Sequence, residues 1–313
     1  MTSALIPDQI TRVKAPDLTR DLDLLDDEVA KLLDFTPEVK RAPARYGQAL
    51  GGKSVALLFE KPSLRTRLTF ELAVQQMGGS VVAAEGPIGA REPLKDVARN
   101  LDRWVSAIVA RTFAQDTIEE LARWSSVPVI NALSDRFHPC QALADVFTLS
   151  ERFGELRGLK LAFIGDGNNV ANSLMLTAIR LGMNFSIATP RGYEPDPDIV
   201  ACARSAAAVS GAVLEIGNNP AEAVAGANAV YTDVWASMGQ ESEAEKRRRV
   251  FTPYQVNEKL FAQALPDAIF LHCLPAKRGE EVTDAVIECP RSLVFDQAEN
   301  RLHVQKALLL MML

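Results

Sequence analysis

Short apolar runs alternate with longer amphipathic stretches along the first half of the chain. Runs such as SVALLFE (54–60) are apolar throughout and too short for helices, which is typical of buried strands. Stretches such as TRLTFELAVQQMGG (66–79) carry apolar residues at helical spacing and end in glycine. The pattern predicts helical structure at 18–47, 66–79, 94–104, 116–125 and 141–154, and strands at 54–60, 80–84, 107–112 and 127–132.

A second series of short apolar runs alternating with amphipathic stretches follows Gly154, where the predicted helix 141–154 ends. An apolar stripe at helical spacing in 299–313 predicts a final helix that packs on the body of the protein. The alternation as a whole is typical of parallel sheets with helices on both faces. Strands are predicted at 159–167, 184–190, 212–217, 227–234, 268–275 and 292–297.

Length and pattern together predict an α/β protein of two domains, each a parallel sheet with helices on both faces. The chain has 313 residues, enough for about two domains at roughly 150 residues each. We expect the first domain at 1–148, joined by a C-terminal helix at 297–313, and the second at 149–296.

Composition and charge exclude several classes of protein. With 48% apolar and 24% charged residues, the chain is neither disordered nor collagen-like. The formal charge of −6 gives no general field that attracts nucleic acid or anionic lipid, so an anionic ligand must be bound locally. No apolar run approaches the roughly 20 residues of a membrane span, and the acidic N-terminal segment does not resemble a targeting peptide. We therefore expect a cytoplasmic protein without nucleic-acid or membrane partners.

The cysteines predict neither disulfides nor a metal site. Cys140, Cys202, Cys273 and Cys289 form no CxxC pair and no metal-binding spacing with histidine. Reduced thiols and no bound metal are expected.

Two nucleotide-binding patterns occur in the wrong context. GQALGGKS (47–54) matches the P-loop, but a helix is predicted before it and a strand after it, the reverse of a P-loop. Its glycines are better explained as left-handed helix caps at Gly51 and Gly52. GDGNNV (165–170) lacks the third glycine of the dinucleotide fingerprint, and no acidic residue ends the next strand. This turn more simply places Asn168 and Asn169 at the ligand edge of a sheet.

The charge run 241–249 predicts a solvated loop or helix face.

KPSLRTR (61–67) predicts an anion site. It follows a strand and begins a helix, so that Ser63, Arg65, Thr66, Arg67 and the free N–H groups of the first turn converge. Arginine adds a fixed charge and a two-pronged donor. A capped helix with surface arginines is the alternative.

Two further motifs stand at strand ends. FHPCQ (137–141) lies where a strand passes into a helix, and its histidine is as well explained by structure as by function. HCLPAKRG (272–279) follows an apolar strand, so that Cys273 emerges at its carboxyl end, where α/β sheets bind ligands. A buried inert cysteine is the alternative.

Taken together and in this order, the motifs resemble the aspartate/ornithine carbamoyltransferase family, in particular its ornithine branch. The combination comprises SLRTR, HPCQ, GDGNNV, DVWASMG (233–239), HCLP and ENRLHVQ (299–305), and it spans most of the chain. DVWASMG and HCLP resemble the ornithine enzymes and differ from the aspartate enzymes. The resemblance implies an active site in the cleft between the domains and transfer of a carbamoyl group from carbamoyl phosphate to the δ-amine of L-ornithine.

The resemblance also implies site residues. The first domain binds carbamoyl phosphate and the second binds ornithine; Asn169, Asp233, Ser237 and Met238 are implied for ornithine. Arg111, His138, Asp233 and Cys273 are implied as catalytic. The residues implied for carbamoyl phosphate are Ser63, Leu64, Arg65, Thr66, Arg111, His138, Gln141, Cys273, Leu274 and Arg301.

This chemistry requires neither cofactor nor metal, since an amine attacks a carbonyl carbon and phosphate leaves. The family resemblance implies a homotrimer. The chain departs from its relatives at Leu64, where many carry threonine, although the backbone N–H there can still donate. The loop EGPIGAREP (85–93) lacks the glutamine that relatives often extend into a neighbouring subunit's site.

Alternatives remain within and outside this class. Acetylornithine, succinylornithine or putrescine could be the acceptor, but the intact DVWASMG and the absence of tryptophan from 80–93 favour ornithine. A non-catalytic homologue is expected to have lost site residues, and none of these is missing: Arg65, Arg111, His138, Gln141, Cys273 and Arg301. A nicotinamide-dependent oxidoreductase is the third alternative, which titration with NADH would reveal.

Overall fold

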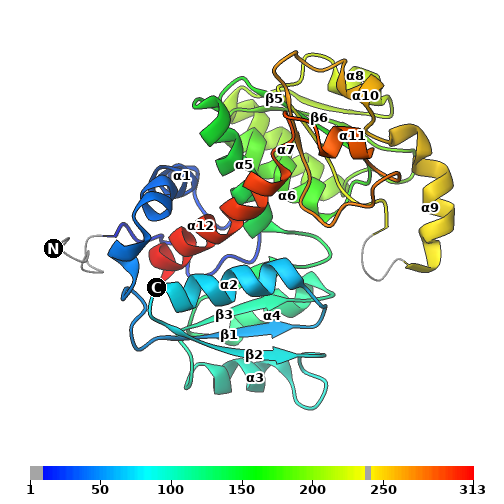
Figure 1. Cartoon of the computed structure of the whole chain (residues 1–313). Helices are drawn as coiled ribbons and strands as arrows, with labels where there is room; N and C mark the ends of the chain where they lie inside the picture. Colours follow the sequence, from blue (N-terminus) through cyan, green and yellow to red (C-terminus); the bar gives the residue numbers. More distant parts are fainter. Residues whose placement is uncertain (1–9, 237–240) are drawn as a thin grey trace. The chain divides into compact units, whose positions relative to one another are not determined.

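The computed structural model describes residues 10–236 and 241–313, which form two compact units (Figure 1). The first unit comprises Met1–Phe147 and Glu299–Leu313, and the second comprises Thr148–Ala298. No helix in the described ranges is both long and apolar enough to span a membrane.

The first unit contains a four-stranded sheet in which every pair is parallel. Strand β1 is central and buried along nearly its whole length, which explains its continuous apolar sequence. The order is β2-β1-β3-β4. The strands are β1 (Ser54–Phe59), β2 (Ser80–Glu85), β3 (Ala107–Arg111) and β4 (Val129–Leu133).

Helices cover both faces of this sheet (Figure 1). Buried side chains of β1 and β3, including Leu58 and Ile108, pack against Ile118 and Leu121 of α4. Helix α2 lies on the opposite face, as expected for right-handed crossovers when the step from β1 to β2 runs one way along the sheet and the later steps to β3 and β4 run the other way. The helices are α1 (Asp26–Arg41), the 3-10 helix η2 (Pro43–Tyr46), α2 (Leu64–Gln76), α3 (Leu94–Leu101) and α4 (Gln115–Trp124). Helices α5 (Pro139–Phe153) and α12 (Val294–Met312) contribute residues to both units.

The second unit contains a five-stranded parallel sheet in the order β7-β6-β5-β8-β9. Its strands are β5 (Lys160–Ile164), β6 (Asn184–Ala188), β7 (Leu214–Gly217), β8 (Ala229–Thr232) and β9 (Ile269–Leu271). Its helical elements are α6 (Asn169–Arg180), α7 (Pro197–Ser210), α8 (Pro220–Val224), η3 (Glu241–Glu243), α9 (Ala244–Phe251), η4 (Thr252–Tyr254), α10 (Glu258–Phe261) and α11 (Asp284–Ile287).

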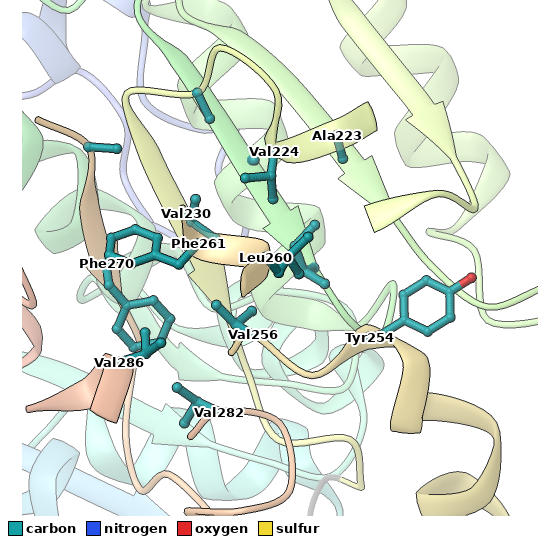
Figure 2. Packing of buried hydrophobic residues seen from close by; sticks show 14 of the residues in the cluster. Ala223, Val224, Val230, Tyr254, Val256, Leu260, Phe261, Phe270, Val282 and Val286 are labelled. Atoms are coloured by element: carbon teal, nitrogen blue, oxygen red, sulfur yellow. The ribbon is translucent and has the colours of Figure 1, made fainter. Parts of the chain in front are cut away.

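Figure 2 shows the apolar core on one face of the second sheet. Val230 of β8 and Phe270 of β9 pack with Leu260 and Phe261 of α10. The rings of Phe261 and Phe270 meet edge to face, with centroids 6.2 Å apart. This core fixes β8 and β9 beside each other and thereby fixes the loops that follow them.

The predicted α/β fold is confirmed, and most strands lie where the pattern placed them. The strand predicted at 292–297 is wrong: Ser292 forms only an isolated bridge with Phe270, and helix α12 begins at Val294. Short apolar runs fit either a strand or the first turn of a buried helix, so periodicity alone could not decide. The strand predicted at 268–275 ends at Leu271, because Leu274 takes a left-handed backbone conformation with φ 58°.

The helix predicted at 18–47 is also shorter than expected. Leu18 bridges to Ile130, and the Asp23 carboxylate accepts the N–H groups of Thr19 and Arg20, so α1 begins only at Asp26. The segment before β1 is a turn and β1 follows it, as expected if GQALGGKS is not a P-loop. Gly52 is left-handed as predicted, with φ 77°, whereas Gly51 is not.

Gly167, in the turn after β5, cannot carry a side chain without displacing backbone. A Cβ there would lie 2.2 Å from the backbone nitrogen of Pro195. We predict that Gly167→Ala lowers the free energy of unfolding by about 1–3 kcal/mol, measured by urea denaturation. Gly217→Ala is the matched control, since a Cβ there meets nothing within 4 Å. Equal stability of both variants would contradict this reading of the turn.

Candidate active site

Three polar side chains follow three neighbouring strands of the second sheet. Asn168 comes after β5, Asp233 directly after β8 and Cys273 two residues after β9. Because β5, β8 and β9 are parallel and adjacent, their carboxyl ends lie along one edge of the sheet. The sheet therefore gathers these three side chains at one place.

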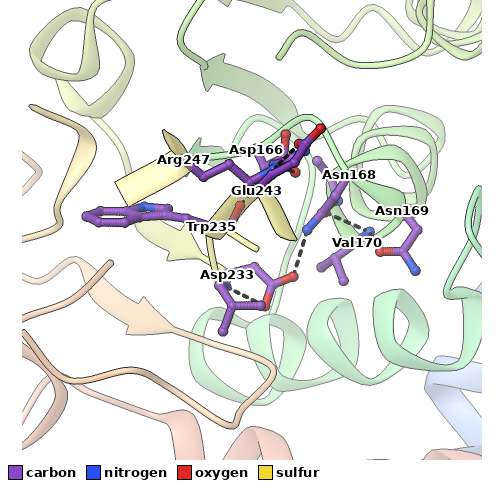
Figure 3. A network of polar contacts seen from close by, with 10 residues as sticks. Asp166, Asn168, Asn169, Val170, Asp233, Trp235, Glu243 and Arg247 are labelled. Carbon is purple, nitrogen blue, oxygen red and sulfur yellow. Dashed lines mark hydrogen bonds and ion pairs between the residues drawn. The ribbon is translucent and has the colours of Figure 1, made fainter. Parts of the chain in front are cut away.

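The Asp233 carboxylate is the centre of this cluster. Its Oδ2 accepts a hydrogen bond from Asn168 Nδ2 at 2.8 Å (Figure 3). Its Oδ1 accepts from the Val234 N–H at 2.8 Å and from the Cys273 thiol at 3.1 Å. Asp233 is buried, so these donors replace the water that it loses. The structure thus brings Asp233 and Cys273 into direct contact.

Asn168 holds Asp233 because its side chain is itself fixed. It is the N-cap of α6 and accepts from the N–H groups of Val170 and Ala171 at 3.0 and 3.1 Å (Figure 3). Asn169 is the first residue of α6, with a buried side chain whose Oδ1 accepts from the Val170 N–H. Asn169 lies beside the cluster, whereas its neighbour Asn168 makes the contact with Asp233.

His272 and Glu281 support the loop that carries Cys273. His272 Nδ1 accepts from the Leu274 N–H at 2.9 Å, so Nε2 is the protonated nitrogen of the neutral ring and donates to Glu281 Oε1 at 3.2 Å. Both side chains are fully buried. The bond to the imidazole holds Leu274 in its left-handed conformation directly after Cys273.

Asp233, His272 and Cys273 also present potential metal ligands. Within the described residues they form a group in which one ligand atom from each lies within 4.8 Å of the others. Both ring nitrogens of His272 are already engaged, and the thiol of Cys273 donates to Asp233. A metal would have to break these bonds, so the donor set does not fit a resident ion.

A buried ion pair lies near the cluster (Figure 3). Arg247 Nη1 donates to Asp166 Oδ2 at 2.7 Å and to the carbonyl oxygen of Trp235 at 2.9 Å. The side chains of Arg247 and Asp166 are only 8% and 9% exposed. The prediction that 241–249 is solvated is therefore wrong for Arg247. Asp166 belongs to the turn that carries Asn168, so the pair ties α9 to that turn.

The segment KPSLRTR, for which the sequence predicts an anion site, leads into the start of α2 in the first unit. Ser63 is the N-cap of α2 and its side chain makes no capping bond, so the N–H groups of the first turn remain for a ligand. Thr66 is buried, Arg65 half-buried and Leu64 exposed. Arg67 instead pairs with Glu71 at 2.8 Å and with Glu85.

Arg301 joins this helix start from the far end of the sequence. Its Nη2 donates to Thr66 Oγ1 at 2.6 Å, and the arginine is buried. Arg111 is the last residue of β3 and pairs in register with Phe59, the last residue of β1. The first unit thus gathers cationic side chains near the start of α2.

The pKa of His138 is well below its ordinary value because of burial, and the charges of Arg301 and Arg111 lower it further. The imidazole is therefore neutral near pH 7. Burial likewise raises the pKa of Cys140 to about 12, so this thiol is not a nucleophile. Gln141 is buried; its Nε2 donates to Asp145 Oδ1 at 2.8 Å, and its Oε1 accepts no hydrogen bond within the described residues.

Most of the predicted site residues fall into two clusters, one in each unit. The first contains Thr66, Arg111, His138 and Arg301, and the second contains Asp233 and Cys273 with Asn169 and Leu274 beside them. Ser237 and Met238 lie outside the described residues. The sequence did not reveal Asp166, Arg247 or Glu281, because no local pattern indicates which distant charges will be buried together.

Each of the two α/β units thus contributes one polar cluster, a cationic helix start in the first and a carboxylate–thiol pair in the second, and family models match each unit separately. The family model described as "Aspartate/ornithine carbamoyltransferase, carbamoyl-P binding domain" matches residues 17–151. The corresponding "Asp/Orn binding domain" model matches residues 157–312. The chain belongs to the aspartate/ornithine carbamoyltransferase family.

Curated relatives agree with this membership. The chain is 50% identical over 308 residues to an ornithine carbamoyltransferase of Anoxybacillus flavithermus, which covers 96% of this chain and 98% of the relative. It is 54% identical over 265 residues to one of Thermococcus kodakarensis, covering 84% of each.

Solved structures have the same fold. The ornithine carbamoyltransferase from Pyrococcus furiosus superposes with a TM-score of 0.92 at 47% identity, covering 94% of this chain and 96% of that one. An N-acetyl-L-ornithine transcarbamylase mutant superposes with a TM-score of 0.86 at 33% identity, covering 95% and 99%. The fold alone therefore does not distinguish the amine that is carbamoylated.

The Asp166–Arg247 pair predicts a pH-dependent stability. Burial raises the pKa of Asp166 to about 6 from 3.8, Arg247 opposes that rise, and Asp233 and Glu243 add to it. Ionised Asp166 thus opposes folding above about pH 6, and the penalty shrinks as the carboxyl is protonated at lower pH. We predict that Arg247→Met lowers the free energy of unfolding by about 3–5 kcal/mol at about pH 8 and by less at about pH 5.

Urea denaturation at the two pH values measures this effect. Arg249→Met is the control, because Arg249 forms an exposed pair with Glu245 and should contribute about 0–1 kcal/mol. A loss of stability in Arg247→Met that is the same at both pH values would show that Asp166 is not the group left unpaired.

Proposed function

We propose that the protein is an ornithine carbamoyltransferase, which transfers the carbamoyl group of carbamoyl phosphate to the δ-amine of L-ornithine and forms L-citrulline and phosphate. The observation that carries the proposal is the Asp233–Cys273 contact at the carboxyl edge of the second sheet. This pair suits a cationic amine, while the first unit suits a phosphate. Similarity to enzymes with this name over nearly the whole chain supports the same substrates and a role in arginine biosynthesis.

In this proposal the start of α2 binds the phosphate group. The N–H groups of its first turn, including that of Leu64, donate together with Ser63, Arg65 and Thr66. Helix N-termini and arginine both favour a dianionic phosphate, and phosphate gains charge when it leaves. Arg111 would stabilise the leaving group from the end of β3.

The carbamoyl group needs hydrogen-bond partners of both kinds. Neutral His138 can donate to the carbonyl oxygen, where charge develops in the tetrahedral species. Arg301, held on Thr66, adds a charged donor there. The Oε1 of Gln141 can accept from the carbamoyl NH₂ group. We assign the backbone of Cys273 and Leu274 to this group as well.

We assign the ornithine side chain to the second unit. Asp233 would bind the protonated δ-amine, with Asn169, Ser237 and Met238 holding the rest of the amino acid. The amine must lose a proton before its lone pair can attack the carbonyl carbon. Cys273 and Asp233 are the acid–base groups that we assign to that step.

The proposed reaction balances without a cofactor. The δ-nitrogen forms a bond to the carbonyl carbon, and the tetrahedral species then breaks its bond to the phosphate oxygen. Two protons leave the nitrogen in all: one before the attack, by way of Asp233 or Cys273 to water, and one after the attack, which the leaving phosphate takes. Positioning of two substrates and stabilisation of oxygen charge account for the catalysis.

Related amines are the alternative acceptors, and one assay separates them. Purified protein is incubated with carbamoyl phosphate and ornithine, acetylornithine, succinylornithine, putrescine or aspartate, and ureido product and phosphate are measured. We expect ornithine to give the highest kcat/KM. A higher value for any other amine would reject the assignment.

We further propose that the protein is a cytoplasmic homotrimer. Support comes from an exposed apolar stripe on α2, formed by Leu64, Leu68 and Leu72 at four-residue spacing. Val82 on the neighbouring strand β2 is exposed as well. The stripe begins at Leu64, so a subunit packed on it would lie next to the proposed phosphate site.

Arg65→Ala should abolish most of the activity. It removes a charge-assisted hydrogen bond to phosphate, a loss of about 2–4 kcal/mol in transition-state stabilisation. Steady-state kinetics with carbamoyl phosphate measure it. Arg65→Lys should recover only part, because lysine lacks the planar two-pronged donor. Arg67→Ala is the control, since Arg67 is engaged by Glu71 and Glu85. Wild-type kinetics in Arg65→Ala would exclude the start of α2 as the phosphate site.

The kcat/KM for ornithine should rise between about pH 6 and about pH 8, because an aliphatic amine has a pKa of ~10.4 and must be neutral to attack. Asp233→Asn and Cys273→Ser should each lower kcat/KM across this range, and both should retain binding of carbamoyl phosphate measured by calorimetry. Cys202→Ser, at an exposed position, is the control. If either site variant keeps the wild-type profile, or both lose carbamoyl phosphate binding, the division of roles is wrong.

The double variant Leu68→Glu/Leu72→Glu should convert the trimer to monomers, because it places charges on the apolar stripe. Sedimentation equilibrium gives the mass. Val209→Glu, on the exposed face of α7, should leave the mass unchanged. A monomeric wild-type protein, or a trimeric double variant, would exclude this stripe as the trimer interface.

A further inference from the structure

Glu60 occupies the position directly after the central strand β1 and before KPSLRTR. Its side chain is half-buried and both carboxylate oxygens accept backbone hydrogen bonds. Oε1 accepts from the Ile88 N–H at 3.0 Å, and Oε2 accepts from the Phe113 N–H at 2.9 Å. The two donors belong to different loops, one after β2 and one after β3.

The backbone at this point makes the same two connections. The Phe59 carbonyl accepts from the Gly86 N–H at 3.0 Å, and the Glu60 N–H donates to the Arg111 carbonyl at 2.9 Å. Each loop is therefore attached twice, once by backbone and once by the carboxylate. Past the ends of the strands, the Glu60 carboxylate continues the hydrogen bonding that joins β1 to β2 and to β3.

Lys61, the residue after Glu60, also contacts Phe113. Lys61 Nζ lies 4.5 Å from the centroid of the Phe113 ring, and Lys61 is buried. Glu60 and Lys61 thus hold the backbone and the ring of one residue, two positions after Arg111. The attachment fixes the segment that leaves the end of β3.

We propose that Glu60 is a positioning residue for the carbamoyl phosphate site, which sets Arg111 and the loop after β2 relative to the start of α2. The proposal rests on the proposed function, since it takes that helix start as the phosphate site. A carboxylate that accepts two backbone N–H groups is itself compensated, so it can stand beside an anion site without weakening it. A neutral apolar residue would leave both N–H groups without this acceptor.

Substitution of Glu60 tests the proposal. We expect Glu60→Ala to raise KM for carbamoyl phosphate and Kd for inorganic phosphate by roughly ten- to hundredfold, because small misplacements of binding groups are costly. KM for ornithine at saturating carbamoyl phosphate should stay within about twofold. Glu60→Gln should lie between, since its amide keeps one acceptor oxygen and turns an NH₂ group toward the other N–H.

Glu120→Gln is the matched control. Glu120 is a carboxylate of the same unit whose hydrogen bonds, in the part of the chain that the structure describes, go to Arg123 and Trp124 of its own helix α4. Hydrogen exchange gives a second readout: the amides of Ile88 and Phe113 should exchange faster in the Glu60 variants and at the wild-type rate in Glu120→Gln. If Glu60→Ala does not fold, Glu60→Gln is judged by the same measurements.

Phosphate affinity within about twofold of wild type in the folded Glu60 variants would overturn the proposal, as would an equal loss of affinity for both substrates. The titration uses inorganic phosphate and needs no turnover. It therefore separates this inference from the proposed function: a wild-type protein that fails to carbamoylate ornithine would reject the function, while the phosphate titration would still decide the role of Glu60.

Discussion

Parallel pairing of β5, β8 and β9 is the constraint on which the second cluster depends. Only because these strands are adjacent and point the same way do residues from positions 168, 233 and 273 meet at one edge. Side chains hold the segments that follow β5 and β9: Asn168 caps α6, and the imidazole of His272 accepts from the Leu274 N–H. The sheet sets the positions of these three side chains, and buried hydrogen bonds set their orientation.

The chain carries a formal charge of −6, so any anion that it binds has to be attracted by a local group of cationic side chains. The arginines of the first unit have different partners. Arg67 is paired with two carboxylates, whereas Arg301 donates to the hydroxyl of Thr66 at the start of α2. One consequence is visible in His138, whose pKa is low because of burial and two neighbouring arginines. Burial, helped by these charges, keeps the imidazole neutral, and a neutral imidazole still carries one N–H that can donate a hydrogen bond.

The sequence allowed the α/β fold, most strands and the motif residues to be predicted, because apolar runs and strand-end motifs are local signals. It did not predict the groups that support them. Arg247 lies in a run of charges that is exposed at most of its positions, and only the tertiary structure buries it on Asp166. Glu60, which joins β1 to two loops, and Glu281, which accepts a hydrogen bond from His272, are ordinary glutamates in sequence. The helix start at Val294 was missed because an apolar run of that length fits a strand equally well.

Burying charged groups such as Asp166 and Arg247 lowers the folding stability, so the contacts that they make indicate their role. Asp166 is buried so deeply that its pKa rises to about 6 despite the guanidinium of Arg247, so the pair is an expensive way to connect α9 with the turn before α6. An apolar contact would connect these elements with less loss. It would not, however, direct hydrogen bonds to the carbonyl of Trp235 and to the turn that carries Asn168. The ion pair therefore contributes more to the orientation of the turn that carries Asn168 than to stability. Through Asn168, it orients the hydrogen-bond donors around Asp233.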